Sequence, residues 1–214
     1  DITPEATRAA LTSVVATQKE GVNIIIDGNG KKFDGTFYIH GQARHTGKET
    51  LTFKNINFEH AAGTLDFISC NETGSVERYA HNVTIEDCTF TGNTNGDVVG
   101  MRWRQCYNIV VKNVEATNMH SLMWATGSTT IDIDGAELVN CLNGISVGTS
   151  KNVSVKNYSI DGGAYGLRAD GSVNTTLTVA DCDITADQPI VVRYLTAAYN
   201  LVLEGENTLT TTDK

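Results

Sequence analysis

Pairs of apolar residues, separated by a single residue, recur along the chain at a nearly constant spacing. Successive pairs start 22 to 32 residues apart. This repeat length is typical of a β-solenoid coil or of a leucine-rich repeat. The Leu-x-x-Leu-x-Leu pattern of the second class is absent, so the spacing predicts an all-β parallel β-helix of about seven to eight coils. The pairs are Ile24/Ile26, Leu51/Phe53, Val83/Ile85, Ile109/Val111, Ile131/Ile133, Val153/Val155, Leu177/Val179 and Leu201/Leu203.

A second column marks a corner in each coil. The residue two positions after the second member of a pair is Asn55, Asp87, Asn113, Gly135, Asn157, Asp181 or Gly205. These residue types tolerate left-handed backbone angles, so we expect a tight corner at the same place in every coil. Apolar residues at the first and third positions after the corner predict a second inward-facing strand.

The column between the apolar pair and the corner carries charges of alternating sign. In a parallel stack these side chains lie ~4.8 Å apart on neighbouring coils, where opposite charges attract. We therefore interpret this face as a structural, solvated surface. The column reads Lys54, Glu86, Lys112, Asp134, Lys156, Ala180 and Glu204.

The same register predicts the state of two cysteines. Cys88 and Cys182 share a column but lie four coils apart, which is ~19 Å at that spacing. A disulfide requires Cα atoms within about 7 Å, so both are predicted to be free, buried thiols.

The chain is expected to form one domain, with a capping helix at residues 3–20 and coils at residues 22–210. Thr3, Pro4 and Glu5 form a helix-start pattern, Val14 and Val15 belong to an apolar stripe, and a glycine follows at position 21. Such a helix would cover the first coil. The C-terminal end shows no comparable cap.

Composition narrows the possible partners. Formal net charge is −9, which argues against a nucleic-acid partner because phosphate binding needs clustered Lys and Arg. No apolar run approaches the ~20 residues that span a bilayer, so no membrane insertion is expected. No signal peptide is visible, and an export signal is presumed to have been removed.

Two segments, Asn82–Asn93 (NVTIEDCTFTGN) and Asn108–Asn113 (NIVVKN), resemble coils of the pectin-lyase-like superfamily of right-handed parallel β-helices. The resemblance covers nearly the whole chain. That superfamily includes pectate lyases, polygalacturonases, epimerases, phage tailspikes and many bacterial surface proteins. The resemblance implies a right-handed helix and an extracellular or cell-surface protein that contacts carbohydrate.

In this fold, ligands usually lie along the strand that precedes each apolar pair. Here that face gathers most of the remaining aromatic and arginine residues of the chain. The ligand-binding candidates are Asp97, Arg102, Arg104, His120, Trp124, Arg168, Asp170, Arg193 and Tyr194.

The two tryptophans on this face have alternative interpretations. Their spacing predicts that Trp103 and Trp124 stack on adjacent coils and share the inward face of Met101 and Leu122. A sugar-stacking platform is the alternative. Either way, Arg102 and Arg104 are expected to point outward, where an anionic sugar can meet them.

No catalytic motif is evident on this face. Asn93–Asp97 faintly resembles a polygalacturonase segment, but Asn95 replaces the acid. An inverting hydrolase needs two carboxyl groups about 6.5–9.5 Å apart, and a lyase needs a base beside a Ca²⁺ site. The acids are too scattered for either, and the histidines show no zinc-ligand spacing, so no cofactor is predicted.

Three functions are compatible with these patterns. The first is an adhesin-like, non-catalytic module whose partner is a polysaccharide or cell-surface glycan. The second is a polysaccharide lyase, hydrolase or epimerase acting on acidic glycans, with Ca²⁺ required only for the lyase. The third is a tailspike-like structural protein, which is expected to be trimeric.

Overall fold

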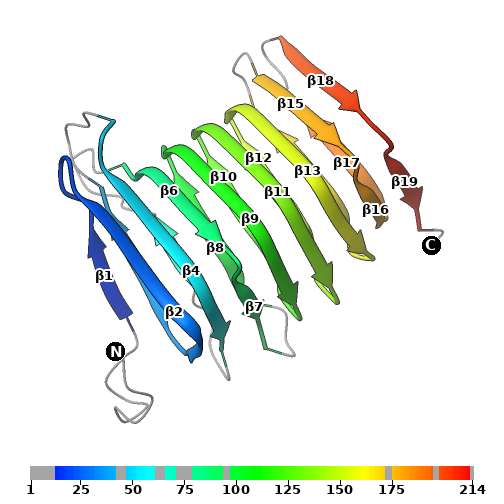
Figure 1. The fold of residues 1–214 in the computed structure, drawn as a ribbon. Coiled ribbons are helices and arrows are strands. Elements are labelled where there is room, and N and C mark those ends of the chain that lie inside the picture. The colour runs from blue at the N-terminus through cyan, green and yellow to red at the C-terminus, as the bar shows by residue number, and fades with distance from the viewer. Residues whose placement is uncertain are drawn as a thin grey trace.

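The computed structural model describes residues 13–41, 47–60, 66–70, 79–93, 97–171, 175–194 and 198–212. They form an all-β parallel β-solenoid of about seven turns, and its coils stack side by side along one axis (Figure 1). Each turn contributes strands to two parallel sheets, one with eight strands and one with eleven. The hydrophobic core lies between these sheets.

The first sheet contains, in order, β1 (Ser13–Thr17), β3 (Thr36–His40), β5 (Ile68–Cys70), β8 (Val99–Arg104), β10 (Ser121–Thr126), β12 (Ile145–Gly148), β14 (Tyr165–Asp170) and β17 (Gln188–Arg193). The second sheet contains β2 (Asn23–Phe33), β4 (Thr50–Glu59), β6 (His81–Glu86), β7 (Thr89–Thr91), β9 (Tyr107–Thr117), β11 (Thr129–Val139), β13 (Lys151–Asp161), β15 (Thr175–Ala180), β16 (Asp183–Ala186), β18 (Tyr199–Glu204) and β19 (Thr208–Thr211).

The register predicted from the apolar pairs is confirmed. Each pair lies beside the next one along the second sheet, from Ile24 opposite Leu51 to Val179 opposite Leu203. From Leu51 to Val179, the members of the pairs are at most 2% exposed. Stacking of like apolar side chains therefore builds one continuous core through the solenoid.

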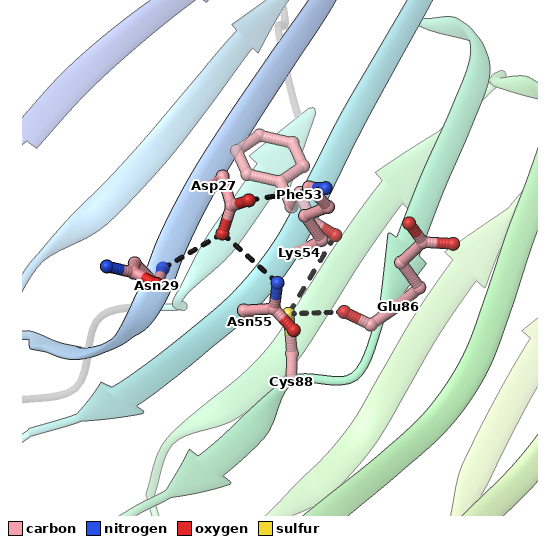
Figure 2. A network of polar contacts seen from close by, with 7 residues as sticks. All are labelled: Asp27, Asn29, Phe53, Lys54, Asn55, Glu86 and Cys88. Atoms are coloured by element: carbon pink, nitrogen blue, oxygen red, sulfur yellow. Dashed lines mark hydrogen bonds and ion pairs between the residues drawn. The ribbon is translucent and has the colours of Figure 1, made fainter.

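The predicted corner is also confirmed. All seven residues of that column have positive φ, between 49° and 81°. Asparagine amides in the column donate to an acid one coil earlier: Asn55 to Asp27 at 3.1 Å, Asn113 to Asp87 at 3.2 Å, and Asn157 to Asp134 at 2.6 Å. Figure 2 shows the first of these, where Asp27 also accepts from the Asn29 amide. Asparagine thus provides both the left-handed angle and a bond between coils.

The charged column has the predicted register, but few of its charges touch. Lys54 lies beside Glu86, and Lys112 beside Asp134. Among the described residues, the one ion pair within 4 Å that a residue of this column makes joins Lys54 to Asp27, one coil earlier, at 3.2 Å (Figure 2). Exposed pairs of this kind contribute less than about 1 kcal/mol each, so the column mainly keeps this face solvated.

The prediction for Cys88 and Cys182 is confirmed, since both are free, buried thiols, and the other three cysteines are buried as well. The Cys88 thiol contacts the carbonyl oxygens of Phe53 at 3.8 Å and Glu86 at 3.3 Å (Figure 2). Burial raises the pKa of Cys88 to about 11, so the thiol stays protonated and packs as a small apolar group.

The N-terminal helix prediction is wrong for residues 13–17, and residues 3–12 lie outside the described residues. Residues 13–17 form β1, which pairs in parallel with β3. Burial alternates along this strand: Val14 packs against the core, Val15 is 55% exposed and Ala16 is buried. This period of two fits a strand, and two adjacent β-branched valines favour it over a helix.

Substitution at the corner tests the left-handed constraint. Asn157→Ala should lower the free energy of unfolding by about 1–2 kcal/mol more than Asn157→Gly, because both lose the bond to Asp134 but only alanine resists positive φ. Urea denaturation of both variants measures the difference. Equal losses would contradict the argument.

Candidate functional site

Two columns of side chains point outward from the first sheet. One column places Arg102, Trp124, Ser146 and Arg168 side by side on β8, β10, β12 and β14. Two residues further along the same strands, the second column contains Arg104, Thr126, Gly148 and Asp170, and continues to Arg193 on β17.

The columns enclose a groove because β12 presents only small side chains. Ser146 and Gly148 lie between the larger residues of β10 and those of β14. The resulting cavity has a volume of about 450 Å³ and extends across four coils. We call it the arginine groove, and its polar and aromatic lining consists of Arg102, Trp103, Arg104, Trp124, Thr126, Ser146, Tyr165, Arg168 and Asp170.

At one end of the arginine groove, Arg102 is held from two sides. Its Nε and Nη2 atoms donate to the two carboxylate oxygens of Asp66, at 2.6 and 3.1 Å. Its guanidinium lies 4.4 Å from the centroid of the Trp124 ring. The bidentate pair and the cation–π contact together fix the plane of this guanidinium.

His120 packs beside this end. Its ring meets Trp124 edge-on, with 5.2 Å between centroids. Burial and the charge of Arg102 lower the pKa of His120, while Asp97 acts in the opposite direction. The imidazole is therefore neutral at pH 7 and can accept a proton.

At the other end, Asp170 is bracketed by two arginines. Arg168 Nε lies 2.6 Å from one carboxylate oxygen, and Arg193 Nε lies 2.8 Å from the other. Burial opposes ionisation of Asp170, but the hydrogen bonds from Arg168 and Arg193 outweigh it, so its pKa is lowered. The Arg168 guanidinium lies 5.5 Å from the Tyr165 ring, and Arg193 lies 5.0 Å from the Tyr194 ring.

Arg104 stands apart from these two ends. It is exposed, lines the arginine groove and makes no ion pair with any described residue. Counting the partners at both ends, the site holds four arginines against two aspartates, Asp66 and Asp170. It is therefore a locally positive surface on a chain whose net charge is −9.

Arginine and lysine are segregated between the two sheets. Three of the seven arginines of the chain lie outside the described residues, and the other four are all on the outer face of the first sheet. Among the described lysines, six lie on strands of the second sheet and none on the first. Arginine can bind planar anions in a bidentate manner, whereas lysine is a strongly hydrated point charge, so the two sheets present side chains of different chemistry to solvent.

The structure groups the predicted ligand-binding residues into two clusters. Arg102, His120 and Trp124 form one, and exposed Asp97 acts on it only through charge. The other contains Arg168, Asp170, Arg193 and Tyr194, while Arg104 lines the groove without joining either. Three contributors were not predicted: Asp66, Tyr165 and the small residues of β12.

The predicted tryptophan stack is wrong. Trp103 is buried in the core at 1% exposed, and it lies in register with Ala125 rather than with Trp124. Trp124 shares the outward column of Arg102, so its ring forms part of the groove wall. The outward orientation expected for Arg102 and Arg104 is confirmed.

Asp66 and Asp170, the two aspartates that pair with arginines of the site, are too far apart to act together in glycoside hydrolysis. Asp66 precedes β5, four strand steps from β14, which at ~4.8 Å per step separates it from Asp170 by about 19 Å. A hydrolase pair requires about 5–9.5 Å. Within the described ranges, no group of three or more His, Cys, Asp and Glu residues is arranged to hold a metal ion.

Comparison with known proteins adds no assignment, because neither a family model nor a curated protein matches this sequence. In the part of the chain that the structure describes, no helix is long and apolar enough to cross a membrane.

The Asp170 network predicts a pH-dependent contribution to stability. Because the folded-state pKa lies below the ordinary 3.8, its contribution is fully present above the unfolded-state pKa and is lost as the pH falls through the folded-state value. Asp170→Asn should therefore lower the free energy of unfolding by about 1–2 kcal/mol at pH 7. The difference in the free energy of unfolding between this variant and the unmodified protein should become smaller below about pH 4.

Denaturant unfolding over a pH series measures this difference. Asp161→Asn is the control, because Asp161 is exposed on β13 and makes no ion pair with a described residue. A difference for Asp170→Asn that persists unchanged into strong acid would contradict the assignment.

Proposed function

We propose that the protein is an adhesin-like, non-catalytic module that binds an anionic polysaccharide or cell-surface glycan along the arginine groove. The observation that carries the proposal is the placement of all four described arginines on the outer face of the first sheet, in a chain of net charge −9. An acidic protein that gathers positive charge on one surface favours a negatively charged partner at that surface.

The shape of the groove suits an extended chain of sugars. It runs across β8, β10, β12 and β14, and therefore along the solenoid axis. Successive coils repeat every ~4.8 Å, which is close to the length of one sugar unit in an extended chain. Its wall combines the Trp124 and Tyr165 rings with guanidinium groups, so it offers both apolar faces and hydrogen-bond donors.

Preorganisation supports anion binding. Arg102 and Arg168 are each held by an aspartate and an aromatic ring, so little side-chain freedom is lost when a ligand binds. Arg104 has no described ionic partner and supplies donors to the ligand directly. Carboxylate or sulfate groups match these guanidinium forks.

The resemblance to pectin-lyase-like coils supports an extracellular setting and a right-handed winding. Parallel strands of one sheet are joined by right-handed crossovers in about 98% of cases, which favours the same hand. The wide separation of Asp66 and Asp170 argues against these two carboxylates acting together as a hydrolase pair.

A glycan array followed by titration with an acidic polysaccharide tests the proposal. Arg104→Ala should weaken binding about 10- to 100-fold, since a hydrogen bond to a charged group contributes about 1.5–3 kcal/mol. Lys112→Ala, which removes the same charge from the second sheet, is the matched control and should leave binding unchanged.

A steric variant separates shape from charge. A Cβ at Gly148 would have no heavy-atom neighbour closer than 3.7 Å, and the backbone there is not left-handed. Gly148→Leu should therefore keep the fold, fill the groove and weaken binding without changing the net charge. No binding to any acidic glycan, or equal losses for Arg104→Ala and Lys112→Ala, would refute the proposal.

A lyase acting on acidic glycans is the second candidate, and the neutral imidazole of His120 beside Arg102 favours it. A base close to a guanidinium can remove the proton next to a sugar carboxylate while the arginine binds the carboxylate. The expected outcome for a lyase is ultraviolet absorbance from an unsaturated product, lost in His120→Ala and in Arg102→Ala. If the unmodified protein binds the glycan tightly but gives no unsaturated product, the lyase is excluded and the non-catalytic module is retained.

A further inference from the structure

Among the described residues, one positive charge remains without a partner at the β8 end of the arginine groove. The Asp66 carboxylate accepts both hydrogen bonds from Arg102, so the charges of this pair cancel. Arg104, two residues further along β8, is exposed and makes no ion pair with a described residue. Asp97 precedes the first residue of β8, so it lies near the opposite edge of the sheet and does not offset Arg104.

A second positive charge remains at the β14 end. The single carboxylate of Asp170 accepts hydrogen bonds from Arg168 at 2.6 Å and from Arg193, on the neighbouring β17, at 2.8 Å. Two guanidinium groups around one ionised carboxylate leave one positive charge. Each end of the groove therefore offers one charge that no described carboxylate cancels.

The middle of the arginine groove is uncharged. β10 and β12 present Trp124, Thr126, Ser146 and Gly148 outward, and none of the residues that line the groove on these two strands carries a charge. A carboxylate placed there would lose hydration without gaining a guanidinium partner, which costs free energy. A neutral sugar gives up less hydration and can pack on the aromatic and small side chains.

Strand spacing sets the distance between the two charged ends. β14 is three strand steps from β8 and β17 is four, so at ~4.8 Å per step the ends are ~14–19 Å apart. Because one step matches about one sugar unit of an extended chain, this separation spans about three to four sugars. A polymer with an acid group on every sugar, or on every second sugar, would place charges over the neutral middle.

We propose that the arginine groove binds a linear acidic heteropolysaccharide whose acid groups are about three to four sugars apart, with neutral sugars between them. This inference rests on the glycan binding proposed above and adds the charge pattern of the ligand. One acid group pairs with Arg104, and the next pairs with Arg168 and Arg193. The neutral sugars between them lie over Trp124 and β12.

Titration calorimetry with three octasaccharides of equal length tests the charge pattern. Deacylated gellan carries one glucuronate in every four sugars, hyaluronan carries one in every two, and oligogalacturonate has an acid group on every sugar. The gellan octasaccharide should bind at least about 10-fold more tightly than the other two, because only its acid groups match both ends of the groove. Attraction by charge density alone gives the opposite order.

A cation added to the neutral middle should change this order. Thr126 is exposed on β10, so Thr126→Lys should keep the circular dichroism spectrum while it places a charge where gellan has neutral sugars. Affinity for the galacturonate octasaccharide should rise about 3- to 10-fold, and affinity for the gellan octasaccharide should stay within about twofold. Ser154→Lys, which adds the same charge to the outer face of the second sheet, is the matched control and should change neither.

The outcomes separate this inference from the proposed function. If the hyaluronan or galacturonate octasaccharide binds as tightly as gellan, and Arg104→Ala weakens that binding, the charge pattern is overturned while glycan binding at the groove stands. If no acidic glycan binds, both are overturned. An equal rise in affinity for gellan and galacturonate in Thr126→Lys also overturns the charge pattern.

Discussion

In-register stacking of parallel strands is the constraint on which the rest of the structure depends. Each side chain lies beside the side chain at the same position one coil away, so the chemistry of a column is multiplied along the axis. Apolar columns become the core, and the asparagine column becomes a series of bonds between coils. The arginine groove has the same origin, because residues distant in sequence become neighbours through the register of β8, β10, β12 and β14.

Outward and inward columns are largely independent of one another. The inward positions of the first sheet, such as Met101, Met123 and Ile145, are buried and fill the core. The outward positions on the same strands hold the groove residues. Filling the core therefore places little restriction on which polar side chains face solvent. This independence explains how one regular scaffold carries arginines on one sheet and a solvated lysine surface on the other.

The second sheet could be predicted from sequence because its columns are strictly periodic. The apolar pairs and the corner residues repeat with little ambiguity, and both were found where expected. A second left-handed column, comprising Asn82, Asn108, Thr130 and Asn152, was missed although asparagine stands immediately before five of the eight apolar pairs. The outward orientation of Trp124 could also have been predicted from the repeat spacing. Ile109 and Ile131 are in register and 22 residues apart. Adding the same 22 residues to Arg102 gives position 124, whereas adding them to Trp103 gives position 125.

Other parts of the site could not be predicted in this way. Asp66 precedes a strand in the longest interval between pairs, where the extra residues have no counterpart in neighbouring coils. Its pairing with Arg102 depends on the path of that segment rather than on periodicity. The N-terminal strand was misread because the helix-start pattern precedes valines whose alternation becomes clear only when β1 is seen against β3.

The small residues of β12 have a consequence for how this surface can change. The depth of the groove is set by two positions, Ser146 and Gly148, and neither belongs to the core. Exchanging the outward residues of one coil for those of a neighbour would shift the depression by one step along the axis and leave the interior untouched. Ligand preference in such a solenoid can therefore diverge by local replacement, coil by coil, without a search for a new way to fold.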